Sequence, residues 1–461
     1  MTALAVEHML DDLGLPEHAK VGLLARNIPA HYAAVWGLFL SARCISMVHA
    51  FQPPVALIED MISNRWPIVL ADGRDWSPEI VNVANSIGAV GYRLTGDARQ
   101  PLECVTARRT SGEQTDKSAN GELVVELLSS GTTGRPKRLP LDRKAVDEMI
   151  ARTVYQFRLG GAAERSTQVT IWPLSALGGF NGALPAAVLG QQIATQERFN
   201  APRMLELIRR HRPPFLALPP SALGMILQLN PRSDDFSSVK LYSSGASPLD
   251  PNVQRRFEDE YGVPVTIAYG ATEFCGIISG WTAAELPLRS AKRLSAGRAL
   301  PGIRIRIVSP ETNLPLPPGE IGLIEALVPR VGDEWARTND LGYLDEEGFL
   351  YLEGRADDTI IRGGFKIAPE EVADVLRTHP LVGDAALIGL KDDRVGMVPA
   401  AAIQKRPGHP APSVEELEAF LRDRLPAYKI PVQFAIVDEI PRTETMKPRR
   451  AGLRALFGAE L

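Results

Sequence analysis

The sequence predicts an α/β protein with a large N-terminal domain of mainly parallel sheets covered by helices and a small α+β domain at the C-terminal end. Two observations support this prediction. Short apolar runs alternate with longer amphipathic runs up to about residue 297, which is typical of parallel strands joined by helices. Beyond that point apolar and polar residues alternate along short segments, which is typical of antiparallel strands.

The expected elements of the large domain follow one another as strand and helix. We expect strands at 20–25, 45–49, 68–71, 123–128, 215–218, 240–243 and 265–268, and helices at 30–44, 79–87, 202–212, 220–229 and 251–261. Because a helix carries the chain back across the sheet, consecutive strands then run parallel. Alternating strands at 303–308 and 322–327, with a turn-rich segment between them, predict a small antiparallel, barrel-like part.

The small domain follows a boundary that we place between residues 356 and 357. This division gives domains of 1–356 and 357–461. Helices are expected at 369–378 and 413–425, and strands at 385–390, 398–403 and 433–437. The second domain has roughly 100 residues, which is an ordinary size for an independently folding unit.

Composition excludes several classes of protein. Of the 461 residues, 45% are apolar and 23% charged, which excludes a disordered or collagen-like chain. A net charge of −4 indicates neither a nucleic-acid partner nor an anionic membrane surface. Three cysteines without a C-x-x-C pattern favour a reduced, cytoplasmic protein. The most apolar stretch, 33–51, is too short and too polar for a membrane span.

A loop rich in hydroxyls and glycines carries the strongest chemical signal. The string SSGTTGRPK at 129–137 follows an apolar strand and ends in a lysine. Its glycines let backbone N–H groups turn towards an anion, while the hydroxyls add donors and the lysine adds a positive charge. The spacing differs from a Walker loop, since Gly131 and Gly134 are only three positions apart. The string therefore predicts a polyphosphate site formed by Ser129, Ser130, Gly131, Thr132, Thr133, Gly134 and Lys137.

This loop and the strings that follow it resemble the motifs of the adenylate-forming superfamily, which contains acyl-CoA synthetases, luciferases and non-ribosomal peptide adenylation domains. The further strings are YGATE at 269–273, TNDLG at 338–342, GRAD at 354–357, GGFKI at 363–367 and PRTETMK at 441–447. The resemblance covers most of the chain from residue 20 onwards. The chain begins close to its first strand, so it is expected to be short at the N-terminus for this family.

The resemblance assigns nucleotide contacts to several residues. Glu273 follows a strand and a glycine-containing turn, where a carboxylate can hold Mg²⁺ against phosphates, with Thr133 as a second candidate ligand. Asp340 and Arg355 are expected at the ribose. The adenine is expected between two small-residue turns that contribute Gly245, Ala246, Tyr269, Gly270 and Thr272.

The same resemblance implies the catalytic and hinge residues. Lys447 would bridge the substrate carboxylate and the α-phosphate, assisted by Thr132 and Glu273. Asp357 would be the hinge about which a mobile C-terminal domain turns. Two glycines of the family pattern are replaced here, by Asn339 and Met446.

The stretches that form the acyl pocket in this family are nearly uncharged here. The expected lining residues are Trp172, Ser175, Leu177, Phe180, Leu218, Ser244, Ala271 and Phe274. Ser175 and Ala176 stand where amino-acid-activating members place an aspartate for the substrate ammonium. An unpaired buried ammonium would cost several kcal/mol, so the pattern favours an apolar aliphatic or aromatic carboxylic acid.

The implied reaction forms an acyl-adenylate and pyrophosphate from ATP, and then transfers the acyl group to the thiol of CoA. Gly363, Gly364 and Lys366 are the expected CoA contacts. Two alternatives stay open: the chain could load a separate carrier protein, or it could bind nucleotide or acyl groups without turnover. The presence of Lys447 and Glu273 argues against the second alternative. The sequence predicts neither the particular acid nor the oligomeric state.

Overall fold

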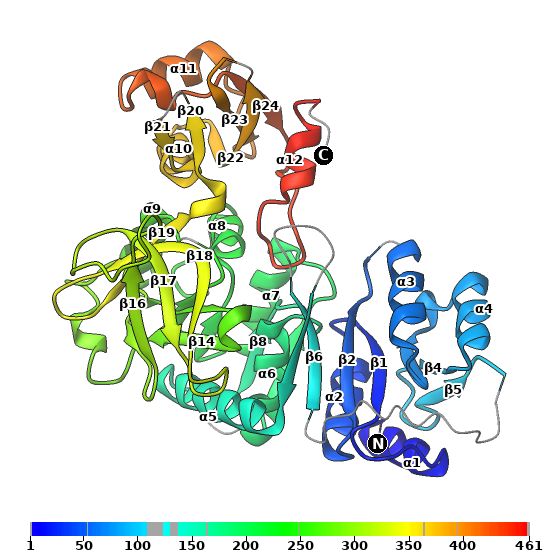
Figure 1. The fold of residues 1–461 in the computed structure, drawn as a ribbon. Helices are drawn as coiled ribbons and strands as arrows, with labels where there is room; N and C mark the ends of the chain where they lie inside the picture. The colour runs from blue at the N-terminus through cyan, green and yellow to red at the C-terminus, as the bar shows by residue number, and fades with distance from the viewer. Residues whose placement is uncertain are drawn as a thin grey trace. The chain divides into compact units, whose positions relative to one another are not determined.

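The computed structural model describes residues 2–52, 54–107, 123–129, 137–162, 165–247, 249–362, 365–392 and 394–458. Figure 1 shows the helices and strands of the chain as a ribbon. The chain divides into two compact units. The first consists of Met1–Asn200 and Leu207–Leu216, and the second of Ala201–Glu206 and Ala217–Leu461. The predicted α/β class is confirmed. The predicted boundary at 356/357 lies inside the second unit.

A mixed sheet forms the core of the first unit. Its described strands have the order β5-β4-β3-β1-β2-β6-β7 and are parallel except for the antiparallel edge strands β5 and β7. The strands are β1 (Lys20–Ala25), β2 (Cys44–His49), β3 (Ile68–Asp72), β4 (Val90–Leu94), β5 (Leu102–Cys104), β6 (Leu123–Ser129) and β7 (Lys137–Asp142). Their apolar side chains are buried because helices cover the sheet.

Four helices accompany this sheet. They are α1 (Thr2–Asp12), α2 (Pro29–Leu40), α3 (Pro54–Asn64) and α4 (Pro78–Ile87), and a short 3-10 turn, η1 (Gly73–Asp75), follows β3. Helices α3 and α4 lie beside this sheet (Figure 1). Their apolar side chains pack on it around the fully buried Trp66. Gly37 of α2 lies so close to α1 that an added Cβ would be 2.5 Å from the carbonyl oxygen of Ala3.

The predicted end of the helix at 30–44 was wrong. The helix ends at Leu40, because Ala42 adopts a left-handed conformation (φ +54°). The N–H of Ala42 donates to Phe39 O and that of Arg43 to Leu38 O, which closes the helix in the manner of a Schellman motif. Glycine usually occupies this position, so the alanine concealed the helix end from sequence reasoning.

Among its described residues, the rest of the first unit holds three parallel strands and two helices. The sequence analysis predicted the strand at 215–218 but missed the other two strands and both helices. The strands are β8 (Thr167–Thr170), β9 (Gln192–Thr195) and β10 (Phe215–Ala217), and the helices are α5 (Arg143–Leu159) and α6 (Leu177–Val188). Helix α7 (Ala201–His211) contributes residues to both units.

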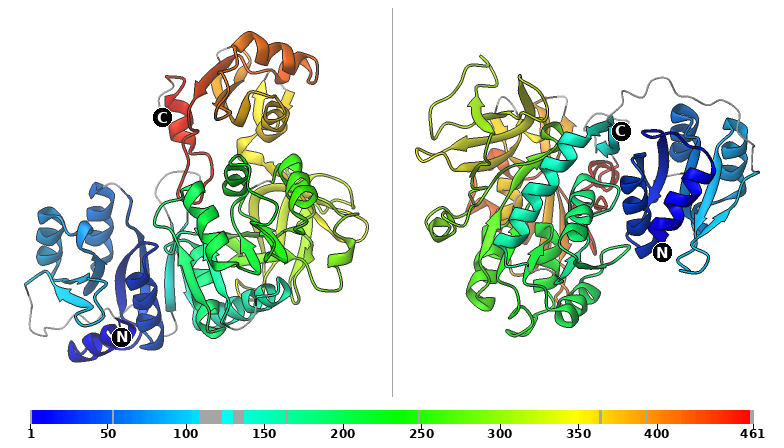
Figure 2. Two further views of the ribbon diagram at one scale, coloured as in Figure 1. Left: turned by 180° about the vertical axis from the view of Figure 1, so that it is seen from behind. Right: turned by 90° about the horizontal axis from the view of Figure 1, so that it is seen from below.

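The second unit begins with a strand–helix layer and continues into antiparallel sheets. Its first elements are α8 (Pro220–Leu227), β11 (Leu241–Ser244), α9 (Pro251–Tyr261) and β12 (Val265–Ile267). An antiparallel set follows, made of β13 (Tyr269–Ala271), η2 (Thr272–Phe274), β14 (Gly276–Gly280), η3 (Leu286–Leu288) and β15 (Arg298–Ala299). Four curved antiparallel strands come next, namely β16 (Arg304–Val308), β17 (Gly322–Leu327), β18 (Trp335–Leu344) and β19 (Leu350–Arg355) (Figure 2).

The C-terminal α+β part follows the short turn η4 (Ala356–Asp358). Its strands are β20 (Ile360–Arg362), β21 (Phe365–Ile367), β22 (Val382–Asp392), β23 (Gly396–Lys405) and β24 (Gln433–Val437), and its helical segments are α10 (Pro369–Arg377), α11 (Val414–Arg422), η5 (Ala427–Lys429) and α12 (Arg450–Ala455). Buried residues of α10 and α11 pack on one face of this sheet. None of the helices among the residues described is both long and apolar enough to cross a membrane.

Gly297 offers a test of the packing in the second unit. It has φ +75°, and an added Cβ would lie 2.0 Å from the backbone oxygen of Gly280. We expect Gly297→Ala to lower the apparent melting temperature strongly. The left-handed conformation of an alanine costs about 1–2 kcal/mol, and the clash with backbone adds about 1–3 kcal/mol.

Gly302→Ala is the matched control for this variant. Gly302 has φ +79°, but no atom lies within 4 Å of the added Cβ, so this variant carries the conformational cost alone. Thermal unfolding followed by circular dichroism compares the two proteins. Equal melting temperatures would contradict the predicted clash at Gly297.

Candidate active site

Tyr269 places a buried phenol beside a carboxylate. It begins β13, which Ala268 separates from β12, and only 6% of the residue is exposed. Its hydroxyl donates to Asp340 Oδ2 at 2.7 Å and lies 3.1 Å from Thr338 Oγ1. Burial, and next the charge of Asp340, raise the pKa of Tyr269 far above its ordinary value. The phenol therefore remains a protonated donor at neutral pH.

A close approach of two strands explains why Gly270 follows Tyr269. An added Cβ on Gly270 would lie 2.3 Å from the carbonyl oxygen of Gly276, so β13 and β14 can approach only at a glycine. This contact fixes the backbone that carries the Tyr269 ring.

Asp340 and Arg355 are opposite each other on the paired strands β18 and β19. Arg355 Nη1 donates to Asp340 Oδ1 at 3.1 Å, while its Nε and Nη2 donate to the two oxygens of Asp357 at 2.8 and 3.1 Å. Burial disfavours the charged guanidinium, but the hydrogen bond with Asp357 and the charge of Asp340 outweigh it and raise the pKa of Arg355. One arginine thus holds both carboxylates in fixed positions.

Asp357 lies in η4, which an arginine of the last helix also contacts. Burial works against its carboxylate, but the hydrogen bond and charge of Arg355, followed by the charge of Arg450, outweigh burial and lower the pKa of Asp357. Arg450 of α12 forms ion pairs with Asp357, at 3.7 Å, and with Asp358. The predicted hinge residue is therefore ionised and linked to helix α12.

The loop at 441–449 carries Lys447 and is closed by backbone bonds. Thr443 N donates to Lys447 O at 2.8 Å, and Arg449 N donates to Pro441 O at 2.8 Å. Solvent reaches the Lys447 side chain. Even so, protein atoms displace enough water from the ammonium to lower its pKa; the charge of Asp340 opposes this shift, and that of Arg355 adds to it.

The fold of the second unit thus brings several predicted site residues close enough for their charges to interact. Lys447 experiences the charges of Asp340, Arg355 and Glu273, three residues from separate motifs. Glu273 is exposed in η2, directly after β13. The turn after β11 contains Ala246 in a left-handed conformation (φ +69°), which agrees with the small residues expected there.

The residues described contain no group of three or more His, Cys, Asp or Glu side chains that could hold a metal ion. An exposed carboxylate such as Glu273 still fits Mg²⁺, because Mg²⁺ is commonly bound by one or two carboxylates together with phosphate oxygens and water. In that arrangement the substrate supplies most of the ligands.

Several predicted residues lie outside the described part of the chain. They are Ser130, Gly131, Thr132, Thr133, Gly134, Gly363 and Gly364, together with the side chains of Ser129, Lys137, Thr272 and Lys366. The expected pocket residues are divided between the units: Trp172, Ser175, Leu177 and Phe180 belong to the first, and Leu218, Ser244, Ala271 and Phe274 to the second. Among them Phe180, Leu218 and Phe274 have no exposed surface.

Sequence reasoning missed a polar pair at Ser175. The hydroxyl of Ser175, a residue that is 1% exposed, lies 2.5 Å from His49 Nδ1 at the end of β2. Asn27 holds the same stretch, because its Nδ2 donates to Trp172 O at 3.1 Å and its Oδ1 accepts from Leu174 N at 2.8 Å. The stretch itself contains no histidine, but the fold supplies one from a distant strand.

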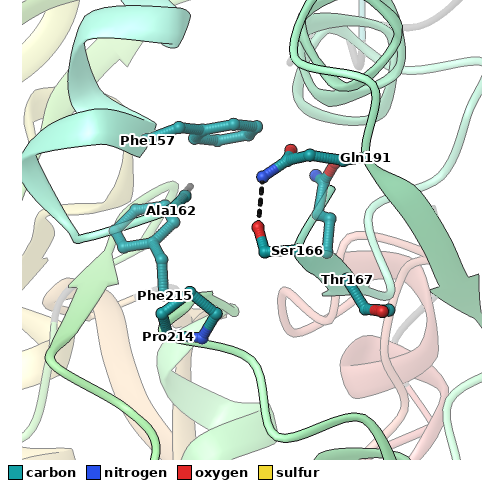
Figure 3. A pocket seen from close by; sticks show the side chains of 8 residues that line it. Phe157, Ala162, Ser166, Thr167, Gln191, Pro214 and Phe215 are labelled. Carbon is teal, nitrogen blue, oxygen red and sulfur yellow. Dashed lines mark hydrogen bonds between the residues drawn. The ribbon is translucent and has the colours of Figure 1, made fainter. Parts of the chain in front are cut away.

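A small pocket of the first unit has no part in this arrangement. Figure 3 shows Gln191 donating to Ser166 Oγ at 2.8 Å inside it. The lining residues are Phe157, Ala162, Ser166, Thr167, Gln168, Gln191, Pro214 and Phe215. It has room for about one water molecule, which is far too little for a nucleotide or an acyl group.

Comparison with known families identifies the chain. Residues 2–326 match the AMP-binding enzyme family, and residues 371–447 match the AMP-binding enzyme C-terminal domain. The chain belongs to the AMP-binding enzymes, and the resemblance to the adenylate-forming superfamily is confirmed.

Similar sequences and structures agree with this membership. The chain is 31% identical to an indoleacetate–CoA ligase of Aromatoleum aromaticum over 71% of its own length and 66% of that protein. It is 30% identical to a 2-succinylbenzoate–CoA ligase of Bacillus subtilis over 73% of its own length and 69% of that protein. In fold it is similar to ATP-bound MatB from Rhodopseudomonas palustris, with a TM-score of 0.81 and 22% identity over 99% of this chain and 92% of that one.

The bond between Tyr269 and Asp340 yields a prediction for nucleotide binding. Tyr269→Phe removes a donor to a carboxylate, and the loss of one such bond corresponds to about a tenfold weaker Kd for AMP. Because the high pKa keeps the phenol protonated, we expect the same factor at pH 7 and pH 9 in isothermal titration calorimetry.

Tyr343→Phe is the control. Tyr343 is on β18, the strand that carries Asp340, but its ring stacks on Tyr351, with centroids 4.8 Å apart. A pH-dependent loss in Tyr269→Phe, or an equal loss in Tyr343→Phe, would contradict the assigned role of the phenol.

Proposed function

We propose that the chain is an AMP-forming acid–thiol ligase that activates a carboxylic acid with ATP and transfers the acyl group to CoA. One observation supports this most directly: the charges of Asp340, Arg355 and Glu273, which come from separate motifs, all act on the Lys447 ammonium. Membership of the AMP-binding enzymes and the similarity to CoA ligases support it further.

In the first step a carboxylate oxygen attacks the α-phosphorus of ATP, and the bond to the β-phosphate breaks to release pyrophosphate. The Lys447 ammonium would neutralise charge on both the carboxylate and the α-phosphate. Asp340 accepts from Tyr269 and Arg355 in the structure, but each of its oxygens keeps a second lone pair for a ribose hydroxyl. Glu273 would hold Mg²⁺, which supplies charge neutralisation at the phosphate oxygens.

The phosphates themselves would lie in the loop at 129–137. Its hydroxyls and N–H groups, contributed by Ser129, Ser130, Gly131, Thr132, Thr133 and Gly134, would donate to the phosphate oxygens, and Lys137 would add a positive charge. In the second step the thiol of CoA attacks the carbonyl carbon of the adenylate, AMP leaves, and the thiol proton passes to solvent.

The two steps would use different positions of a C-terminal domain that begins at residue 357. Asp357 lies in the short turn η4, in which no residue is buried, and its carboxylate is paired to Arg355. Such a turn can absorb a change of backbone angle without opening a hydrophobic core. Gly363, Gly364 and Lys366 would then contact CoA.

The acid is proposed to be apolar, aliphatic or aromatic. The expected pocket residues are mostly apolar, and the relatives include ligases named for indoleacetate and 4-coumarate. The Ser175–His49 pair adds one polar feature near the expected pocket stretch. Cys44 and Cys104 are free thiols, which favours a reducing compartment such as the cytoplasm.

Pyrophosphate release across a panel of carboxylic acids, with and without CoA, tests the proposal. We expect release that depends on ATP and an acid and that stops in EDTA, with AMP as the nucleotide product. Release of ADP would contradict adenylation, and release unchanged by EDTA would contradict the magnesium assignment.

Lys447→Ala separates the two steps in the same assay. Removing a charge at the developing transition state should lower adenylation by about 10²–10³-fold. Thioester formation from synthetic acyl-adenylate and CoA should stay near the wild-type rate. Equal losses in both half-reactions would indicate that the lysine has a structural role.

Asp357→Pro tests the hinge, because proline fixes φ near −65° and biases Ala356 towards extended conformations. This variant should form acyl-adenylate but stall before the thioester, so that bound adenylate persists after CoA is added in a single-turnover experiment. Asp357→Ala is the matched control, since it removes the ion pair with Arg355 without locking the backbone. If both variants complete the thioester normally, the pivot lies elsewhere; if both stall, the ion pair is the cause.

A further inference from the structure

The carbonyl oxygen of Met446, the residue before Lys447, accepts two hydrogen bonds. Arg442 Nη1 donates to it at 2.7 Å, and Ser221 Oγ donates to it at 3.1 Å. Met446 is buried and has φ +64°, a left-handed conformation that is unfavourable for a residue with a side chain. Such a conformation persists only where the surroundings hold it in place.

Arg442 is itself held by a partly buried chain of charges. Its Nη2 forms an ion pair with Asp384 of β22, and its side chain is 8% exposed. The other oxygen of Asp384 accepts from Arg377 Nε at 2.9 Å and from the N–H of Ala385 at 2.7 Å. Burial opposes the charge of Asp384, but Arg377 and Arg442 outweigh it and lower the pKa of its carboxyl group. The carboxylate therefore remains ionised and can orient Arg442.

Ser221 comes from a different part of the second unit. It lies in the first turn of α8, 225 positions before Met446. Just past the end of the same helix, Gln228 Nε2 donates to Gly383 O at 2.9 Å, next to Asp384. Helix α8 thus contacts the C-terminal part at the Lys447 loop and at the strand that supports Arg442.

We propose that Arg442, Asp384 and Ser221 are positioning residues that hold the Met446 carbonyl, and through it Lys447, in the geometry required for adenylation. A carbonyl bound by two donors fixes the peptide plane from which the Lys447 side chain starts. This inference rests on the proposed function, because it assigns Lys447 to the first step.

The two donors have different consequences. Arg442 and Asp384 belong to the same α+β part as Lys447, so their bond accompanies the loop wherever it moves. Ser221 belongs to α8, so its bond forms only when the loop lies against that helix. Loss of either bond should slow adenylation, since a displacement of about 1 Å of a catalytic group can cost about 10²-fold in rate. Neither loss should slow the thioester step.

Steady-state adenylation kinetics and thioester formation from synthetic acyl-adenylate test this inference. We expect kcat for adenylation to fall about tenfold in Ser221→Ala, the equivalent of one neutral hydrogen bond, and about 10²-fold in Arg442→Gln. KM for ATP and for the acid should be unchanged, and so should the thioester step. Ser221→Thr keeps the hydroxyl and should restore the rate.

Matched controls remove similar bonds elsewhere in the second unit. Arg406→Gln removes an arginine bond to the carbonyl of Val382, and Ser237→Ala removes a hydroxyl bond to the carbonyl of Asp234. Both should adenylate normally. If Arg442→Gln does not fold, Asp384→Asn removes the charge that orients Arg442 while keeping the side-chain shape, and the same slow adenylation is expected.

Hydrogen–deuterium exchange of a peptide covering 441–449 measures loop order without turnover. Exchange should accelerate in Ser221→Ala and Arg442→Gln, and stay at the wild-type rate in the controls and in Ser221→Thr. Unchanged exchange and unchanged adenylation in both variants would overturn the inference, as would a higher KM or equal loss of both half-reactions. If the wild-type protein adenylates no acid while exchange responds as expected, the proposed function fails but the positioning of the loop stands.

Discussion

The carboxylate of Asp340 is the group on which the described part of the site depends. Tyr269 donates to one of its oxygens and Arg355 to the other, so that β13, β18 and β19 meet at one charge. A partly buried carboxylate needs such donors, because it has lost part of its hydration. The same charge acts on Lys447 and offsets part of the desolvation of its ammonium. Asp340 therefore couples the strands of the proposed nucleotide site to the loop of the proposed catalytic lysine.

The Lys447 loop is held by interactions of two strengths. Inside the C-terminal part, Arg442, Asp384 and Arg377 form a partly buried chain of charges, and breaking such a chain leaves an uncompensated charge. Towards α8 the loop has a neutral bond from Ser221, worth about 1 kcal/mol. Because the contacts within its own part of the chain are stronger than its contact with α8, the loop can leave α8 and return to it without losing its own conformation. This arrangement fits an enzyme whose lysine is proposed to serve only the first of two steps.

Hydrophobic periodicity predicted the α/β class and the order of strands and helices in the large part of the chain, because a buried face must recur every two or about 3.6 residues. It failed where backbone geometry departs from residue preference. Helix α2 ends at Leu40 because Ala42 takes a left-handed conformation that usually belongs to glycine. Helix α6 has apolar residues on nearly all sides, including Pro185 in its interior. It therefore lacks the amphipathic pattern from which periodicity predicts a helix.

For the site, the motif strings predicted which chemistry is present, since hydroxyls, glycines and a lysine in one short loop, or a carboxylate after a strand, are local properties of the chain. Only the tertiary structure shows which groups from distant parts of the chain complete that chemistry. His49 lies beside Ser175, and Ser221 donates to Met446 across 225 positions. The sequence around a serine in the first turn of a helix does not reveal whether a loop folds against that serine. The hydrogen bond exists only when the two remote segments are packed together.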